Sequence, residues 1–239
     1  MNDLSHLLKG NLEKISGLPP EQQKEILALI EEYESVKEKE TARENFLPFV
    51  KLMWPSFIHG RHHEIMAEAF EKVARGDLKR LIINMPPRHT KSEFASYLFP
   101  AWFLGKYPEK KVIQTAHTAE LSVGFGRKVR NLIQNTDFQE VFPGIELSAD
   151  SKAAGRWNTN KRGDYFAIGV GGAVTGKGAD ILIIDDPHSE QEATIGDYNP
   201  EVYDKVYEWY TSGPRQRLQP GGAIILVMTR WSKRDLTGQ

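Results

Sequence analysis

The sequence predicts an α/β protein with a mostly parallel sheet and helices on both faces, preceded by a small helical subdomain. Two runs, residues 81–85 and 179–184, are largely aliphatic, as are parallel strands that are buried on both faces. Each run ends in a polar loop, and strand-like and helix-like patterns alternate through most of the remaining chain. With 239 residues, of which 40% are apolar and 26% charged, the chain can form one substantial core and a small subdomain.

Composition excludes several classes of protein. The chain has no cysteine, which rules out disulfides, thiolate metal sites and cysteine nucleophiles and is compatible with a reducing cytoplasm. The formal net charge is −1, so a nucleic-acid-binding face has to be a local basic patch. The first residues lack the apolar core of a signal peptide, and no run is long enough to span a bilayer, so we expect no membrane partner.

We expect residues 1–60 to form an N-terminal helical or lid region and residues 61–239 to form the core domain. Pro19 and Pro20 set a helix start, and apolar residues follow at helical spacing between Glu and Lys side chains. A surface helix packed on the core is the favoured interpretation of residues 1–45. A docking arm for a partner is the alternative.

An aromatic stretch, residues 46–60, leads into a histidine cluster and then an amphipathic helix that begins near Ile65. His62 and His63 are adjacent rather than four residues apart, and no cysteine or acidic ligand set accompanies them. This spacing argues against a metal site.

Residues 81–92 predict a strand and a loop, and residues 93–104 predict a helix. In this context a Lys-Ser pair acts as a phosphate-binding loop. Lys91 would reach the β- and γ-phosphates of a nucleotide, and Ser92 would ligate Mg²⁺. The alternative is a proline-rich turn with a surface arginine and lysine.

The loop lacks the usual glycines, since Met85 and Thr90 stand at their positions. Pro86 and Pro87 supply stiffness instead, because proline has a fixed φ and no N–H to donate. Such a loop needs a substitute cation, and Arg88 is placed to fork onto phosphate oxygens.

The run at residues 179–184 ends in two adjacent carboxylates, Asp185 and Asp186, followed by a proline. Because ligands bind at the carboxyl ends of strands in open α/β sheets, Asp185 is expected to organise Mg²⁺. Asp186 would position and deprotonate the attacking water, with Glu190 in reserve. Together with the Lys-Ser loop, this pattern predicts a site for a nucleotide and Mg²⁺.

The remaining elements fit the same α/β pattern. We expect a strand at residues 110–116, a helix at 119–134, a hairpin between 156 and 174, a helix at 201–211 and a buried strand at 223–228.

The helix at residues 119–134 should have an apolar and a basic face. Its inward side chains are expected to be Leu121, Val129, Leu132 and Ile133. Its outward cations are expected to be Arg127, Lys128 and Arg130. A solvated face is the commoner explanation of such cations, and contact with DNA or a neighbouring subunit is the alternative.

Three motifs resemble those of the large terminase subunit of tailed bacteriophages. They are Pro86-Pro87-Arg88-x-x-Lys91-Ser92, Asp185-Asp186-Pro187 and Met228-Thr229-Arg230-Trp231. The resemblance covers residues from about 46 to 239. That family packages viral DNA with an N-terminal ATPase and cuts it with a C-terminal nuclease.

The resemblance implies an additional-strand RecA-like P-loop NTPase, with Walker A at the Lys91 loop and Walker B at the Asp185 strand. It also implies hydrolysis of ATP that powers translocation of double-stranded viral DNA into a procapsid. A helicase and a non-catalytic nucleotide-binding module remain as rivals.

The resemblance also assigns site residues. The implied nucleotide-binding set is Pro87, Arg88, His89, Thr90, Lys91, Ser92 and, cradling adenine, one of His62 and His63, with His62 the first candidate. The implied catalytic set is Asp186, Arg88, Lys177 and Thr229.

Thr229 would couple hydrolysis to DNA movement, and Arg230 would hold the adjoining loop, touch the nucleotide or cap the strand by a salt bridge. Lys177 lies in a glycine-rich loop and would reach the γ-phosphate of an adjacent subunit. Arginine is the family's usual residue there, and lysine cannot fork onto two oxygens. Arg127, Arg130 or Arg156 could replace Lys177, or Arg88 could suffice in cis.

The family also often has glutamate where Asp186 stands, so the attacking water would have to sit closer. The implied partners are double-stranded DNA, the portal protein, the small terminase subunit and further copies of the chain in a ring on the procapsid, in the host cytoplasm. Up to Gln239 we find no acidic constellation of a nuclease, so we expect the ATPase portion of a longer protein without nuclease activity.

Overall fold

The computed structural model describes residues 17–196 and 198–239, and the chain divides into two compact units, Met1–Thr41 and Ala42–Gln239. The first unit contains most of α3 (Pro20–Glu44), which begins beside Pro19 as predicted. Residues 1–16 of the predicted helical region lie outside the described residues. No helix within the described part of the chain combines the length and apolar character that a membrane span needs.

The second unit begins earlier than the predicted boundary at residue 61. The reason is an aromatic cluster around Phe46, whose ring lies 5.5 Å from the rings of Phe70 and Phe94. In addition, the indole Nε1 of Trp102 donates to the carbonyl of Ala42 at 3.1 Å. The segment at residues 42–60 therefore belongs to the core unit.

The second unit is built on a seven-stranded sheet in the order β1-β7-β6-β2-β5-β4-β3. Its strands are β1 (Arg80–Asn84), β2 (Lys111–Ala116), β3 (Leu147–Ala153), β4 (Arg156–Thr159), β5 (Asp164–Gly169), β6 (Ala179–Asp185) and β7 (Leu218–Met228). The five strands from β1 to β5 in this order pair in parallel, and β4 and β3 add antiparallel. The predicted α/β class with a mostly parallel sheet is confirmed.

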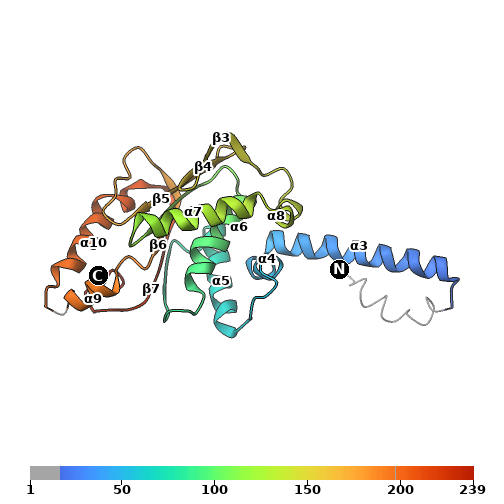
Figure 1. Ribbon diagram of the computed structural model, residues 1–239, viewed down its shortest axis with the longest axis horizontal. Helices are drawn as coiled ribbons and strands as arrows, with labels where there is room; N and C mark the ends of the chain where they lie inside the picture. The colour runs from blue at the N-terminus through green and yellow to red at the C-terminus, as the bar shows by residue number, and fades with distance from the viewer. Residues whose placement is uncertain (1–16, 197) are drawn as a thin grey trace. The chain divides into compact units, whose positions relative to one another are not determined.

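Helices cover both faces of this sheet (Figure 1). They are α4 (Phe46–Met53), α5 (Arg61–Arg75), the π-helix η1 (Glu93–Leu98), α6 (Phe99–Lys106), α7 (Ala119–Ile133), α8 (Thr136–Val141), α9 (Glu190–Gly196), α10 (Glu201–Ser212) and the short 3-10 helix η2 (Pro214–Arg217). Residues of α4 to α8 pack on one face and residues of α10 on the other. In β6, Ile181 and Ile183 join the first core and Leu182 and Ile184 the second, because side chains alternate along a strand.

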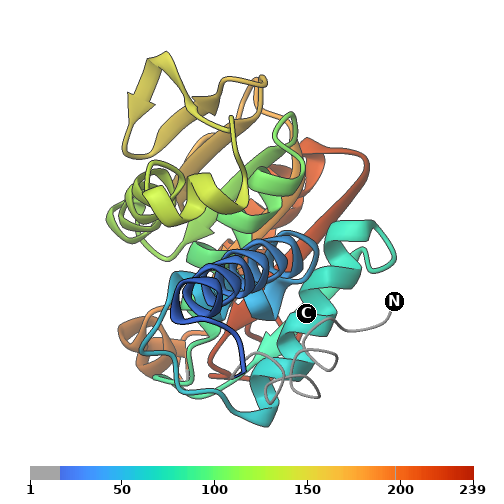
Figure 2. The ribbon, with the colours of Figure 1, turned by 90° about the vertical axis from the view of Figure 1, so that its right-hand side faces the viewer.

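The predicted hairpin is present as β4 and β5, with the Trp157 and Tyr165 rings stacked at 4.6 Å. The β3–β4 pair forms the opposite end of the sheet from β1 and is yellow at the top of Figure 2.

The predicted inward direction of Leu121 is wrong, because its side chain is 54% exposed. The other three predicted inward residues, Val129, Leu132 and Ile133, are buried, and the buried stripe also includes Ser122 and Gly126. Each residue in a helix turns by about 100°, so a stripe that includes Ser122 leaves its neighbour outside.

Candidate functional site

The candidate site lies where three adjacent strands end. β1, β7 and β6 are parallel neighbours in this order, so the loops that follow them meet at one edge of the sheet. Backbone hydrogen bonds close this edge, from Met85 N–H to the Met228 carbonyl at 3.2 Å and from Asp186 N–H to the Val227 carbonyl at 2.9 Å. The three sequence motifs therefore come together, at the place where ligands bind in open α/β sheets.

Lys91, Asp186 and Thr229 form one ionic cluster. The ammonium group of Lys91 is buried and lies 2.9 Å from Asp186 Oδ2 and 3.4 Å from the Thr229 hydroxyl. The Thr229 N–H donates to Asp186 Oδ1 at 2.7 Å, and the Thr229 hydroxyl donates to the Met85 carbonyl at 3.3 Å. Both oxygens of the Asp186 carboxylate are thus held by predicted site residues.

Asp185 is buried and accepts two hydroxyl hydrogen bonds. Ser92 Oγ donates to its Oδ1 at 2.9 Å and Ser96 Oγ donates to its Oδ2 at 2.6 Å. The pKa of Asp185 is raised to about 6, chiefly by burial and also by the negative charge of Asp186. The hydrogen bonds from Ser96 and Ser92 and the Lys91 charge oppose this rise.

Ser96 is a site residue that sequence reasoning missed. It lies in the π-helix η1, the first part of the helix predicted at residues 93–104, and it also accepts a hydrogen bond from the Gln114 amide at 3.0 Å. The available signals were a hydroxyl four residues after Ser92 and a polar residue within the apolar strand β2. Short π-helical segments within longer helices occur frequently at functional sites.

The donors around Asp185 are suited to a hard cation. The Ser92 hydroxyl and the Asp185 carboxylate lie within hydrogen-bond distance and offer only oxygen, which Mg²⁺ prefers. In residues 17–196 and 198–239, no group of three or more His, Cys, Asp or Glu side chains is arranged to hold a metal.

The phosphate-loop backbone corrects one expectation. Arg88 and Thr90 both have φ of 64°, in the left-handed region that favours glycine. Thr90 stands at the position of the usual second glycine and adopts the backbone conformation that a glycine would have there. Stiffness from Pro86 and Pro87 therefore does not replace this conformation. Within the same loop, Nδ1 of His89 lies 2.9 Å from the Pro87 carbonyl.

His62 lies beside this loop, with its ring centroid 6.3 Å from that of His89 and 3.7 Å from that of His63. Its role at an adenine base stays a prediction. Only His63 of the two has a hydrogen bond to the loop among the described contacts, through Nε2 to the Thr90 hydroxyl at 2.6 Å.

Lys177 lies just before β6, at the amino-terminal ends of the parallel strands and therefore at the opposite end of the strands from Lys91. Its ammonium group is 2.9 Å from Asp164 Oδ2 and 5.0 Å from the centre of the Phe166 ring, and the side chain is 13% exposed. To reach a neighbouring subunit the ammonium group would have to leave Asp164. Its cross-subunit role stays a prediction.

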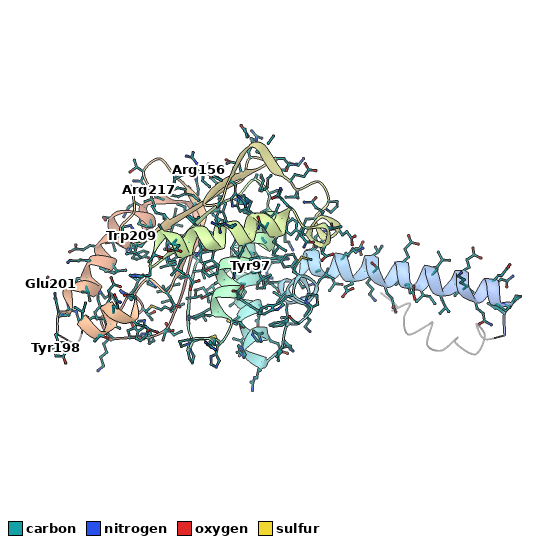
Figure 3. All side chains as sticks on the ribbon, viewed as in Figure 1. Tyr97, Arg156, Tyr198, Glu201, Trp209 and Arg217 are labelled. Atoms are coloured by element: carbon teal, nitrogen blue, oxygen red, sulfur yellow. The ribbon has the colours of Figure 1, made fainter. Side chains whose placement is uncertain are left out.

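The arginine alternatives to Lys177 lie elsewhere on this unit. Arg127 is exposed on α7, and the Arg130 guanidinium contacts Asn131 at 3.0 Å. Arg156 is exposed on β4 and is labelled in the upper part of Figure 3.

Arg230 holds the loop that follows the Thr229 strand. Its Nε donates to Asp235 Oδ2 at 2.9 Å, and the same oxygen accepts the N–H groups of Trp231 and Ser232. Of the expected roles, the salt bridge that organises the adjoining loop is the one seen.

No known protein-family model and no curated protein sequence matches the chain. Among solved structures, the crystal structure of the HK97 bacteriophage large terminase is similar at 11% identity, with a TM-score of 0.47. The match covers 84% of this chain and 39% of that chain, so this chain spans well under half of the terminase's length. At this score the likeness supplies no argument about function.

Proposed function

We propose that this chain is a Mg²⁺-dependent ATPase of the additional-strand RecA-like P-loop class. The observation that carries the proposal is the ionic cluster of Lys91, Asp186 and Thr229 beside the Ser92–Asp185 contact. The class name fits the strand order, because β7 is an additional strand between the one that leads to Lys91 and the one that ends in Asp185.

Lys91 and Arg88 would bind the phosphates. A bound triphosphate offers Lys91 a stronger anionic partner than one carboxylate, so Lys91 would exchange its contact with Asp186 for phosphate oxygens. Because Asp186 now lies 2.9 Å from that ammonium group, its released carboxylate would remain close to the terminal phosphate. There the Asp186 carboxylate would orient a water molecule and accept a proton from it. The hydrogen bond from the Thr229 N–H would keep this carboxylate correctly oriented.

Ser92 and Asp185 would hold Mg²⁺, and the ion would neutralise phosphate charge when bound. Ser96 would keep the Asp185 carboxylate in place. Catalysis would then consist of positioning and charge neutralisation, with no covalent intermediate on the protein.

We further propose that hydrolysis powers translocation of double-stranded viral DNA into a procapsid in the host cytoplasm. The support is the resemblance of the three motifs to large terminase subunits. The same resemblance supports partnership with a portal protein, a small terminase subunit and further copies of the chain in a ring. It also supports Lys177 as a residue that acts on the neighbouring site.

The test is Mg²⁺-dependent phosphate release from ATP over a range of protein concentrations, with and without double-stranded DNA. Lys91→Ala and Asp186→Asn are expected to lose the activity, while Lys161→Ala, on an exposed turn residue, serves as the matched control. If the rate per subunit rises with protein concentration and Lys177→Ala abolishes this activity, the result would support Lys177 as a residue that acts on the site of a neighbouring subunit.

Other outcomes decide against parts of the proposal. If Lys177→Ala releases phosphate at the wild-type rate, the ATPase proposal stands and the cross-subunit role of Lys177 is wrong. Binding of ATP without phosphate release, at every concentration and with DNA, favours the non-catalytic module. Strand separation on forked DNA favours a helicase.

A further inference from the structure

Thr90 has an unfavourable backbone conformation. Its φ of 64° lies in the left-handed region, where a β-branched residue is an outlier. Glycine would adopt this conformation freely, whereas Thr90, which directly precedes Lys91 and Ser92, carries a β-branched side chain. A conformation of this kind persists only where surrounding contacts hold it.

The contact that holds it comes from His63. Nδ1 of His63 accepts the Gly60 N–H at 2.9 Å, so in the neutral ring Nε2 carries the proton and donates to the Thr90 hydroxyl at 2.6 Å. That hydroxyl donates to the His89 carbonyl at 2.6 Å. The Thr90 side chain is therefore fixed on two sides.

The His63 ring is itself rigidly placed. It is 3% exposed, on the first turn of α5, and packs between Phe57 at 4.6 Å and Phe94 at 5.0 Å between ring centroids. The pKa of His63 is lowered to about 4, chiefly by burial and also by nearby His62 and His59, so the ring stays neutral near pH 7.

We propose that His63 is a positioning residue of the phosphate loop, which stabilises at Thr90 the backbone that a glycine would otherwise provide. The proposal rests on the proposed nucleotide site and deepens it. His63 acts through Thr90 and needs no contact with the nucleotide. Without it, the loop would visit its binding-competent form less often, and ATP affinity would fall by that fraction.

The test is a double-mutant cycle of His63→Phe and Thr90→Gly, read as KM for Mg²⁺-ATP, kcat and binding of a fluorescent ATP analogue. Phenylalanine keeps a ring between Phe57 and Phe94 but removes both hydrogen bonds. In the Thr90 background, His63→Phe is expected to weaken nucleotide binding about tenfold, with a smaller effect on kcat. In the Thr90→Gly background it is expected to weaken binding less than about twofold.

Equal loss in both backgrounds would overturn the proposal, because the effect of His63 would then not pass through Thr90. His63→Gln, whose amide can still donate to Thr90, should recover part of the affinity, and His59→Phe serves as the matched control in the same cluster.

Amide hydrogen exchange of residues 88–92 in the nucleotide-free protein separates this proposal from the proposed function. Faster exchange in His63→Phe than in wild type supports the positioning role even if the chain hydrolyses nothing. Unchanged exchange contradicts it even if the chain is an active ATPase.

Discussion

At the residue scale, the site is a buried ammonium group balanced by one carboxylate. Lys91 is 5% exposed, whereas the Asp186 side chain is 39% exposed, so the ammonium group is buried and its carboxylate partner faces solvent in part. Asp186 has φ of 37°, another backbone angle that L-residues rarely adopt. Its strain is offset by the hydrogen bonds to Lys91 and Thr229.

Asp186→Asn should destabilise the nucleotide-free protein, because it removes the carboxylate that pairs with the buried Lys91 ammonium group. We expect a loss of about 1–3 kcal/mol, below the range for fully buried pairs because Asp186 is partly exposed. Phosphate restores the counter-charge, so Mg²⁺ with a non-hydrolysable ATP analogue should raise the Tm of this variant more than that of wild type. Thermal unfolding with and without the analogue measures both effects.

The matched control is Asp204→Asn, which removes a carboxylate of nearly the same exposure whose partner, Arg234, is itself exposed. It should leave both the Tm and its nucleotide-induced rise near the wild-type values. Equal nucleotide-induced rises in wild type and Asp186→Asn would show that phosphate does not replace Asp186 at Lys91.

At the element scale, the order of the strands creates the site. β7 is the last strand in the chain, yet it lies between β1 and β6. This insertion puts Thr229, just beyond β7, within reach of both Lys91 and Asp186. Helix α7 supports the neighbouring strands through a close approach at Gly126, whose carbonyl accepts the Trp157 indole N–H at 3.1 Å.

Two glycines of α7 should respond in opposite directions to alanine. A Cβ at Gly126 would lie 2.5 Å from the Ala154 carbonyl oxygen, which is backbone and cannot turn aside, whereas a Cβ at Gly124 would meet nothing within 4 Å. We expect Gly126→Ala to lower the free energy of unfolding by about 1–3 kcal/mol. Gly124→Ala should raise it by up to about 1 kcal/mol, through helix propensity.

Urea unfolding of the two variants measures this difference, and each glycine serves as the control for the other. Stabilisation by both substitutions would mean that α7 does not approach the β3–β4 hairpin as closely as described.

At the scale of the whole molecule, the two compact units predict where nucleotide binding resides. The complete sheet and every residue of the ionic cluster belong to the unit Ala42–Gln239. Ala42 is fully buried, so a new chain terminus directly before it would place a charge in the core.

Deleting residues 2–38 keeps a short lead before Ala42 and should leave the Kd for a fluorescent ATP analogue within about twofold of wild type. The Tm of the transition that reports on the sheet should change little, because its core is complete. Loss of nucleotide binding in a folded deletion variant would show that the first unit contributes to the site.

The sequence by itself determined the α/β class, the buried strands and the polar side chains that follow the ends of those strands. These follow from local patterns, since aliphatic runs, a strand–loop–helix junction and a pair of terminal carboxylates are readable from neighbouring residues. The gathering of Lys91, Asp185 and Asp186 was expected because parallel strands end at one edge of a sheet.

Only the tertiary structure decided the contacts that complete the site. His63 and Thr90 are 27 residues apart, Ser96 and Asp185 are 89 apart, and Lys177 is paired with Asp164 at the amino-terminal ends of the parallel strands. The early start of the core unit at Ala42 and the exposure of Leu121 also depend on packing between elements. Such contacts are set by which side chains the fold brings together, and a pattern of adjacent residues carries no record of them.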